Sequence, residues 1–88
     1  MSLPPIGIEG SVGAGGRNRR ADVRRVQGRL NALAPERLAP LVEDGLNGPR
    51  TEGAIRAFQR AVLNFANPDG RVDRAGRTHR ALDRPGSR

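Results

Sequence analysis

Apolar residues recur at helical spacing in three separate stretches of the chain. In the first stretch, the steps between them are three, four and three residues, at Val23, Val26, Leu30 and Leu33. This spacing places the four side chains on one face of an α-helix, which we expect to span about residues 21–33. Pro35 prevents the helix from continuing much further along the chain.

The second stretch begins at Pro49, which suits the first helical position because its missing N–H would have no partner there. We expect the buried face of this helix to carry Ala54, Ile55, Phe58, Ala61 and Val62, with Phe65 as an extension. Asn64, Asn67 and Pro68 then end the helix. A third, shorter helix is predicted for about residues 74–82, with Asp73 as its N-terminal cap.

Residues 1–20 contain two prolines and five glycines, a composition that predicts an extended, flexible arm rather than a helix. Ile6, Ile8 and Val12 alternate with other residues, so part of the arm is expected to lie on the domain as a strand-like piece. The run from Gly13 to Arg17 superficially resembles a phosphate-binding loop, but it lacks the Gly-Lys-Ser/Thr ending. We interpret this run as flexible linker.

The sequence therefore predicts an all-α protein, a compact three-helix bundle with Asp-Gly turns. The bundle is expected to occupy residues 21–83, between the arm of residues 1–20 and a tail over residues 84–88. Gly45 and Gly48 are expected to adopt backbone angles that side chains resist. Asp44 and Asp69 are expected to bond to nearby backbone N–H groups. Gln27 and Gln59, beside the apolar stripes, are expected to bond to loop backbone.

Taken together, the three segments resemble the peptidoglycan-binding domain family, small three-helix modules found on cell-wall hydrolases. The matching residues are Val23, Val26-Gln27 and Leu30-Asn31, then Asp44-Gly45, Gly48-Pro49, Thr51, Ala54-Ile55 and Phe58-Gln59, then Asp69-Gly70, Val72, Thr78 and Leu82. The resemblance covers about residues 20–83 and is most specific in the central segment. It implies a three-helix fold that binds bacterial peptidoglycan.

The resemblance also implies where a ligand would bind, in a shallow groove beside the Asp-Gly turns and the helix ends. By position, it gives six ligand-binding residues: Asn47, Arg50, Thr51, Arg71, Arg77 and Thr78. N–H groups in the first turns of the second and third helices could receive carboxylates of a stem peptide. The arginines could add charge-assisted hydrogen bonds; the simpler alternative is that they are only solvated.

The chain departs from the family pattern in three places. The connector of residues 34–43 is proline-rich where the family often has a Gly-aromatic turn, and Asn47 replaces a frequent aromatic residue. The third segment carries Arg77 and His79, with two extra residues before its threonine. The first two departures remove aromatic surface that could stack on sugar rings.

The composition of the chain narrows the class of partner that we expect. The 88 residues carry a formal net charge of +7, and every one of the 16 basic residues is arginine. The planar guanidinium fork holds carboxylates and phosphates, so an anionic partner is plausible; a GC-rich genome is the alternative explanation of the arginine content.

The chain has no cysteine and no run of about 20 apolar residues that could span a membrane. Met1–Ile8 lacks the features of a secretory signal, so we expect either another export route or a fragment of a longer chain.

The residue types needed for catalysis or metal binding are scarce. His79 is the only histidine and is expected to be a surface residue, and Ser2, Ser11 and Ser87 lie in the tails. The run from Asn67 to Asp73 imitates part of an EF-hand loop, but its first and last positions would be Phe65 and Gly76. We therefore expect no enzyme activity, no bound metal and no cofactor.

The leading hypothesis is a non-catalytic module that binds peptidoglycan and localises a cell-wall hydrolase or secreted effector in the periplasm or cell envelope. The alternative is a protein-interaction adaptor of a secretion system or phage-derived assembly, with an exposed apolar patch built by Leu38, Leu41 and Leu46. Net charge also allows non-specific nucleic-acid binding.

Overall fold

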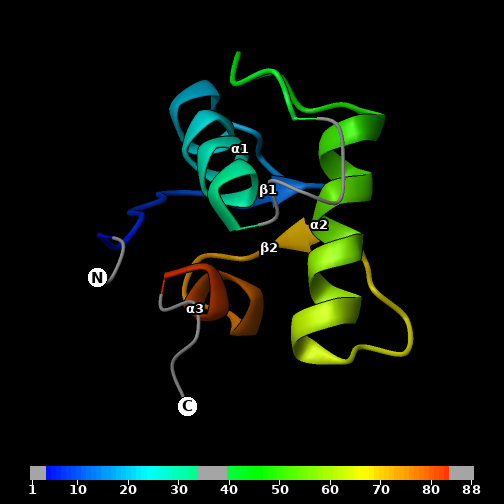
Figure 1. Cartoon of the computed structure of the whole chain (residues 1–88). Coiled ribbons are helices and arrows are strands. Elements are labelled where there is room, and N and C mark those ends of the chain that lie inside the picture. Colours follow the sequence, from blue (N-terminus) through cyan, green and yellow to red (C-terminus); the bar gives the residue numbers. More distant parts are fainter. Residues whose placement is uncertain (1–3, 34–39, 84–88) are drawn as a thin grey trace.

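The computed structural model describes residues 4–33 and 40–83. Three helices, α1 (Arg20–Leu33), α2 (Pro49–Leu63) and α3 (Arg77–Asp83), surround two short strands, β1 (Val12–Gly13) and β2 (Arg71–Val72) (Figure 1). The strands pair antiparallel, with Val12 opposite Val72. The predicted three-helix architecture is confirmed, and the pairing of β1 with β2 adds a two-stranded sheet to the all-α bundle that the sequence predicts. Residues 34–39 of the predicted connector, with Leu38, and the tail of residues 84–88 lie outside the described residues.

One apolar core joins all five elements. Its buried members are Ile8, Val12, Val23, Val26, Leu30, Ile55, Phe58, Val72 and Leu82. The predicted stripe of α1 is confirmed, because three of its four residues are buried and Leu33 packs against the core. Full burial of side chains this size contributes roughly 1.5–3 kcal/mol each.

The predicted buried stripe of α2 is correct at Ile55 and Phe58 but wrong at its end. Ala61 is exposed, and Val62 keeps 54% of its surface exposed. The buried face of the helix ends at Gln59, so the last turn runs past the core. Phe65 is half-buried, with the Arg77 guanidinium 4.9 Å from its ring centroid.

The third helix begins later than the sequence predicts, at Arg77 rather than near residue 74. Asp73 is not its cap, because it lies four residues before the helix and its carboxylate bonds to Arg71 instead. The Asp73 carbonyl accepts a hydrogen bond from the Gly76 N–H at 2.9 Å. Ala75, between them, has a left-handed φ of 62°. Residues 73–76 therefore form a separate turn, and the first helical bond runs from the Arg80 N–H to the Gly76 carbonyl at 3.0 Å.

The described part of the N-terminal arm, residues 4–19, lies on the domain, as its alternating apolar residues predict. Ile8 and Val12 are buried in the core. The Asp22 carboxylate accepts the Glu9 and Gly10 N–H groups at 3.1 and 2.9 Å. The arm is thus held by side-chain bonds as well as by the β1–β2 pairing.

Two residues of α3 also fasten the arm. Asp83 accepts the Ile6 N–H at 2.8 Å, and His79 Nε2 lies 2.9 Å from the Ile6 carbonyl. His79 Nδ1 accepts the Ala75 N–H at 2.8 Å, so Nε2 donates to Ile6. The prediction of a surface histidine is wrong: His79 is buried, and its burial costs little because both ring nitrogens have backbone partners.

The glycine run after β1 is a bonded turn rather than the linker that its composition suggests. The Gly16 N–H bonds to the Gly13 carbonyl at 3.0 Å, and Asn18 Oδ1 accepts the Gly13 N–H at 2.7 Å. Gly13 has a φ of +107°, and a Cβ at this position would lie 2.1 Å from the Gly70 carbonyl oxygen. Only glycine fits at this crossing of β1 and the turn before β2.

We predict that Gly53→Ala stabilises the domain. Gly53 is exposed within α2, and an added Cβ would meet no atom within 4 Å. Alanine should raise the free energy of unfolding by roughly 0.5–1 kcal/mol, because it restricts the unfolded chain and favours helix. Urea denaturation measures this, with Gly13→Ala as the control that should destabilise. Equal effects of the two substitutions would contradict the assigned backbone geometry.

Candidate functional site

A buried glutamine ties the end of the connector to α1 and α2. Gln27 Oε1 accepts the Gly45 N–H at 2.9 Å, and Nε2 donates to the Leu46 carbonyl and to Thr51 Oγ1, both at 3.1 Å. Asp44 Oδ1 accepts the Leu46 N–H at 3.0 Å within the same turn. We call this group the first glutamine clamp. It confirms the prediction that Gln27 bonds to loop backbone.

The same arrangement recurs between α2 and α3. Gln59 Oε1 accepts the Gly70 N–H at 3.0 Å, and Nε2 donates to Asp69 Oδ1, the Arg71 carbonyl and Thr78 Oγ1 at 2.8–3.1 Å. Asp69 Oδ1 also accepts the Arg71 N–H at 3.0 Å. This second glutamine clamp repeats the first, residue type for residue type, except that arginine replaces leucine after the glycine.

The clamp glycines are needed for their backbone angles. Gly45 and Gly70 have φ values of +77° and +70°, in the left-handed region. A Cβ on Gly45 would also lie 2.7 Å from the Arg20 carbonyl oxygen. The matching expectation for Gly48 is wrong, because its φ of −162° is extended and its surroundings are open.

Two of the six predicted binding residues are members of the clamps. Thr51 and Thr78, in the first turns of α2 and α3, are buried, with 4% and 5% of their surface exposed. Their hydroxyls accept hydrogen bonds from the two glutamines. The structure therefore places both threonines in the clamps. That either threonine also contacts a ligand stays a prediction.

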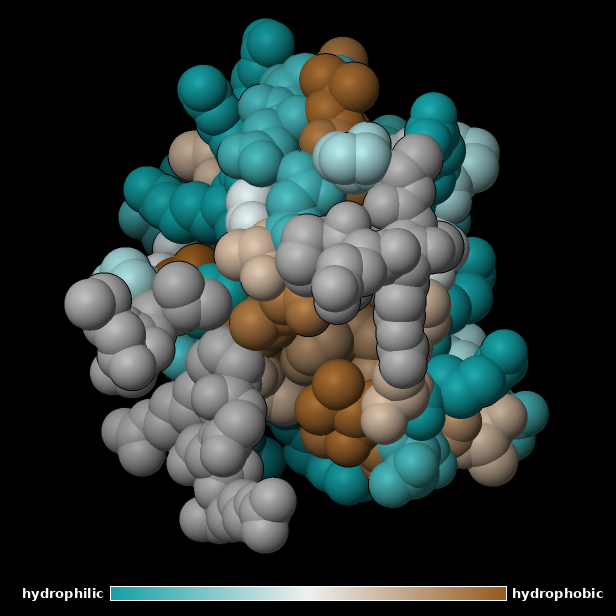
Figure 2. Space-filling model, viewed as in Figure 1, coloured by the Kyte–Doolittle hydropathy of each residue, from teal (hydrophilic) through white to brown (hydrophobic). Residues whose placement is uncertain are grey.

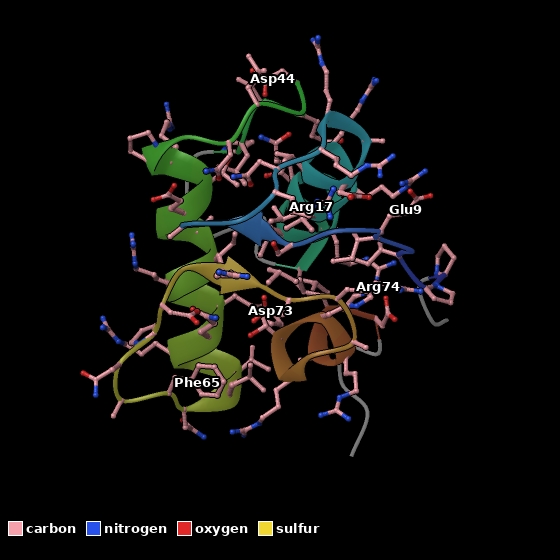
Figure 3. All side chains as sticks on the ribbon, turned by 180° about the vertical axis from the view of Figure 1, so that it is seen from behind. Glu9, Arg17, Asp44, Phe65, Asp73 and Arg74 are labelled. Carbon is pink, nitrogen blue, oxygen red and sulfur yellow. The ribbon has the colours of Figure 1, made fainter. Side chains whose placement is uncertain are left out.

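Two others, Asn47 and Arg71, converge on the turn after β1. Asn47 Nδ2 donates to Glu52 Oε2 at 2.8 Å and to the Gly13 carbonyl at 3.4 Å. Arg71 contacts the Gly15 carbonyl at 3.4 Å. The turn over residues 13–16 therefore lies between the two clamps, with one predicted residue on each side. In Figure 3, Asp44 marks the Asp-Gly turn of the first clamp, Asp73 marks the segment after β2, and Phe65 marks the C-terminal end of α2.

The remaining two, Arg50 and Arg77, are exposed on the first turns of α2 and α3. Among the described residues, neither arginine forms an ion pair, whereas Arg71 Nε bonds to Asp73 Oδ1 at 2.8 Å. Arg77 stacks on the Phe65 ring, a cation–π contact. We call Asn47, Arg50, Arg71 and Arg77 the polar rim. The structure brings Asn47 and Arg71 to one turn and sets Arg77 apart, beside Phe65.

Sequence reasoning did not find the acidic residues that contact this rim. Glu52 holds Asn47 and lies 3.9 Å from Arg56, and Asp73 holds Arg71. The Arg71–Asp73 pair is two residues apart in the sequence, the spacing that places side chains on one side of a strand. The contacts with the Gly13 and Gly15 carbonyls had no local signal, because β1 is far from both partners in the sequence.

The pKa of one carboxyl group in the clamps, that of Asp44, is lowered. The Leu46 N–H holds the pKa of Asp44 below its usual 3.8, with help from Gln27 and Arg20, while partial burial acts in the opposite direction. A carboxylate that accepts such bonds is favoured in its charged form.

We predict that Gln59→Leu destabilises the domain by about 3 kcal/mol, because it leaves the Gly70 N–H and the Arg71 carbonyl without their partner in the interior. Thr78→Val removes one partner of the same amide and should cost less. Urea denaturation of the singles and the double gives the coupling. A double mutant less destabilised than the sum supports the clamp; strict additivity would contradict it.

We predict an acid-dependent contribution from Asp44. Because its folded pKa is lowered, the carboxylate stabilises the fold above the unfolded pKa, and this contribution is lost as the pH falls through the folded pKa. Asp44→Asn keeps the shape without the titration. The difference in unfolding free energy between wild type and Asp44→Asn should be constant above about pH 5 and shrink below about pH 4. A difference that stays constant to pH 2 would refute this.

The described residues, 4–33 and 40–83, contain no group of three or more His, Asp or Glu side chains that could hold a metal ion. In the same residues, no helix combines the length and apolar character needed to cross a membrane.

Comparison with known families identifies the domain. The family model described as "Putative peptidoglycan binding domain" matches residues 19–79, from the start of α1 into α3, so the match includes both glutamine clamps. Comparisons with curated proteins and with solved structures give no match. Since the family match covers well over half of the chain, the protein belongs to the peptidoglycan-binding domain family.

Proposed function

We propose that this chain is a non-catalytic module that binds peptidoglycan through its polar rim and localises a cell-wall hydrolase or secreted effector. The family match over residues 19–79 is the observation that carries the proposal. A domain of this family is expected at the cell wall or envelope, where its polymer is found. Binding there would raise the effective concentration of an attached enzyme on its substrate.

The start of α2 supports binding of a stem-peptide carboxylate. Its N-cap is Gly48, and no side chain bonds to the first-turn N–H groups. Such unpaired N–H groups favour an anion, and Arg50 is exposed in the same turn without an ion pair among the described residues. Glu52 opposes an anion here, but its charge is partly engaged by Asn47 and Arg56.

Asn47 and Arg77 support contacts of a different kind. Asn47 Oδ1 is buried without a hydrogen-bond partner among the described residues. An unpaired buried oxygen is costly, and a donor from a ligand or water would relieve that cost if the Asn47 side chain turned toward the surface. Arg77 is held against the Phe65 ring, which fixes a cation at the surface for a carboxylate or hydroxyl.

A binding role also agrees with the state of the one histidine. Both ring nitrogens of His79 are engaged with backbone atoms of Ile6 and Ala75. A general base must reach a substrate proton directly or through one water. His79 instead fastens the arm to α3, so its place in the fold is accounted for without catalysis.

The alternative is a protein-interaction adaptor, favoured by apolar side chains beside the first clamp. Leu46 and Val42 keep 61% and 72% of their surface exposed. Of the patch predicted from the sequence, Leu41 packs against the core, and Leu38 lies outside the described residues. Only Leu46 is therefore placed as that hypothesis requires.

The test is co-sedimentation with purified peptidoglycan sacculi over a salt series. We predict that the wild type sediments and that Arg50→Ala/Arg77→Ala binds about tenfold less tightly, since two exposed charge-assisted contacts together contribute about 1.4 kcal/mol. Arg60→Ala/Arg80→Ala removes the same charge from exposed positions off the rim and should bind like the wild type. Incubation should release no soluble fragments.

Wild-type protein that stays in the supernatant at low salt would contradict peptidoglycan binding. Equal losses in the two double variants would show that net charge, and not the rim, holds the polymer. Release of soluble fragments would contradict the non-catalytic role.

A further inference from the structure

A second candidate surface lies on α1, away from the polar rim. An open groove of about 780 Å³ runs between α1 and the arm, and it shares no lining residue with the rim. Figure 2 shows hydrophilic residues gathered over α1, where Figure 1 labels the helix. No member of either clamp lines the groove, although Arg20 in its lining donates to the Asp44 carbonyl at 3.1 Å, so the function of the groove has to be argued from its own lining.

The groove combines small or apolar residues with a cationic rim. Pro4, Ile6, Ala21 and Gly28 supply the small and apolar part of its lining. Gly28 keeps the groove open: a Cβ there would meet only Glu43, with its Oε1 at 3.1 Å. A glycine, which has no Cβ, allows another chain to approach the backbone closely.

Four arginines line the same groove, against one acidic residue, Glu43. Arg24 is exposed and forms no ion pair or hydrogen bond with another described side chain. Arg25 lies 3.6 Å from Asp22, whose oxygens already accept two backbone N–H groups of the arm. Glu43 is itself engaged by the Asn31 amide at 2.9 Å. The groove therefore carries an excess of positive charge with little compensation.

Arg29 places a buried positive charge in the lining of the groove. With only 6% of its surface exposed, it donates to two neutral acceptors, the Leu82 and Pro4 carbonyls. A guanidinium remains protonated in proteins, and no carboxylate among the described residues lies within ion-pair distance of it. Burial of a charge without an opposite charge is costly, so an anion brought into the groove would gain from Arg29 as well as from the exposed arginines.

We propose that the α1 groove binds an acidic, extended segment of a partner protein, with carboxylates on the arginines and small apolar side chains on Ile6 and Gly28. The lining decides between possible occupants. A glycan would need aromatic faces or acceptors for its hydroxyls, and the groove offers no aromatic residue and one carboxylate. Nucleic-acid bases likewise lack a ring to stack on. A peptide that carries both carboxylates and small apolar side chains matches the arginines of the groove as well as its small and apolar residues.

The direct test uses a fluorescein-labelled peptide of alternating Glu and Ala and measures fluorescence anisotropy with the full chain. We expect saturable binding, about tenfold weaker for Arg24→Ala/Arg25→Ala because two charged contacts are lost. Arg60→Ala/Arg80→Ala carries the same net charge and should bind within about twofold of the wild type. Gly28→Leu fills the groove without changing charge and should also weaken binding, with the helical circular dichroism unchanged.

Three outcomes would overturn the proposal. Equal weakening by the two arginine pairs would mean attraction by net charge alone, and full binding by Gly28→Leu would place the peptide elsewhere. Tighter binding of a labelled decanucleotide that also depends on Arg24 and Arg25 would assign the groove to phosphates. Sacculus binding by Arg24→Ala/Arg25→Ala should stay at the wild-type level, so failure here is distinguishable from failure of the proposed peptidoglycan function.

Discussion

The fold depends on one repeated interaction, a buried glutamine amide that holds an Asp-Gly turn against the first turn of the next helix. Gln27 and Gln59 each bond to the glycine N–H, to the carbonyl after the glycine and to a threonine hydroxyl. In a domain this small, apolar burial alone leaves little margin. Fully satisfied buried amides fix the geometry where the core is thin, and removal of either one would leave several polar groups unpaired.

The clamps also determine what the surface can present. They fix the first turns of α2 and α3, which carry Arg50 and Arg77, and they leave the turn over residues 13–16 between them. The α1 groove arises differently, from the arm crossing the helix and from the missing side chain of Gly28. Two cationic surfaces with separate origins can therefore be changed separately, and a module that holds a wall polymer and a partner protein at once would use both.

The sequence predicts the helices and the clamps well because their signals are local. The spacing of Val23, Val26 and Leu30 and the Asp-Gly pairs give them without long-range information. It places the start of α3 wrongly because Ala75 adopts a left-handed angle that its residue type does not favour. It misplaces His79 because the partner carbonyl, at Ile6, belongs to the arm at the other end of the chain.

The candidate site could be predicted by residue but not by environment. Family position selects Thr51 and Thr78, whereas only the structure shows that their hydroxyls are bonded to the clamps. The groove on α1 had no sequence signal. Several arginines on one helix are usually a solvated face, and only the structure shows that the arm lies beside them. Both points depend on contacts between segments far apart in the sequence: Gln27 with Thr51 and Gln59 with Thr78 in the clamps, and the arm with α1 in the groove.

Amide hydrogen exchange of Gly45 and Gly70, followed by NMR, tests the central claim most directly. Both N–H groups are buried and bonded to a glutamine oxygen. If the clamps hold the domain together, these amides should exchange only in the global unfolding reaction, with the same free energy of opening as the α1 amides of Val26 and Leu30. Exchange at the rate of an open turn, under conditions in which α1 remains protected, would contradict the claim.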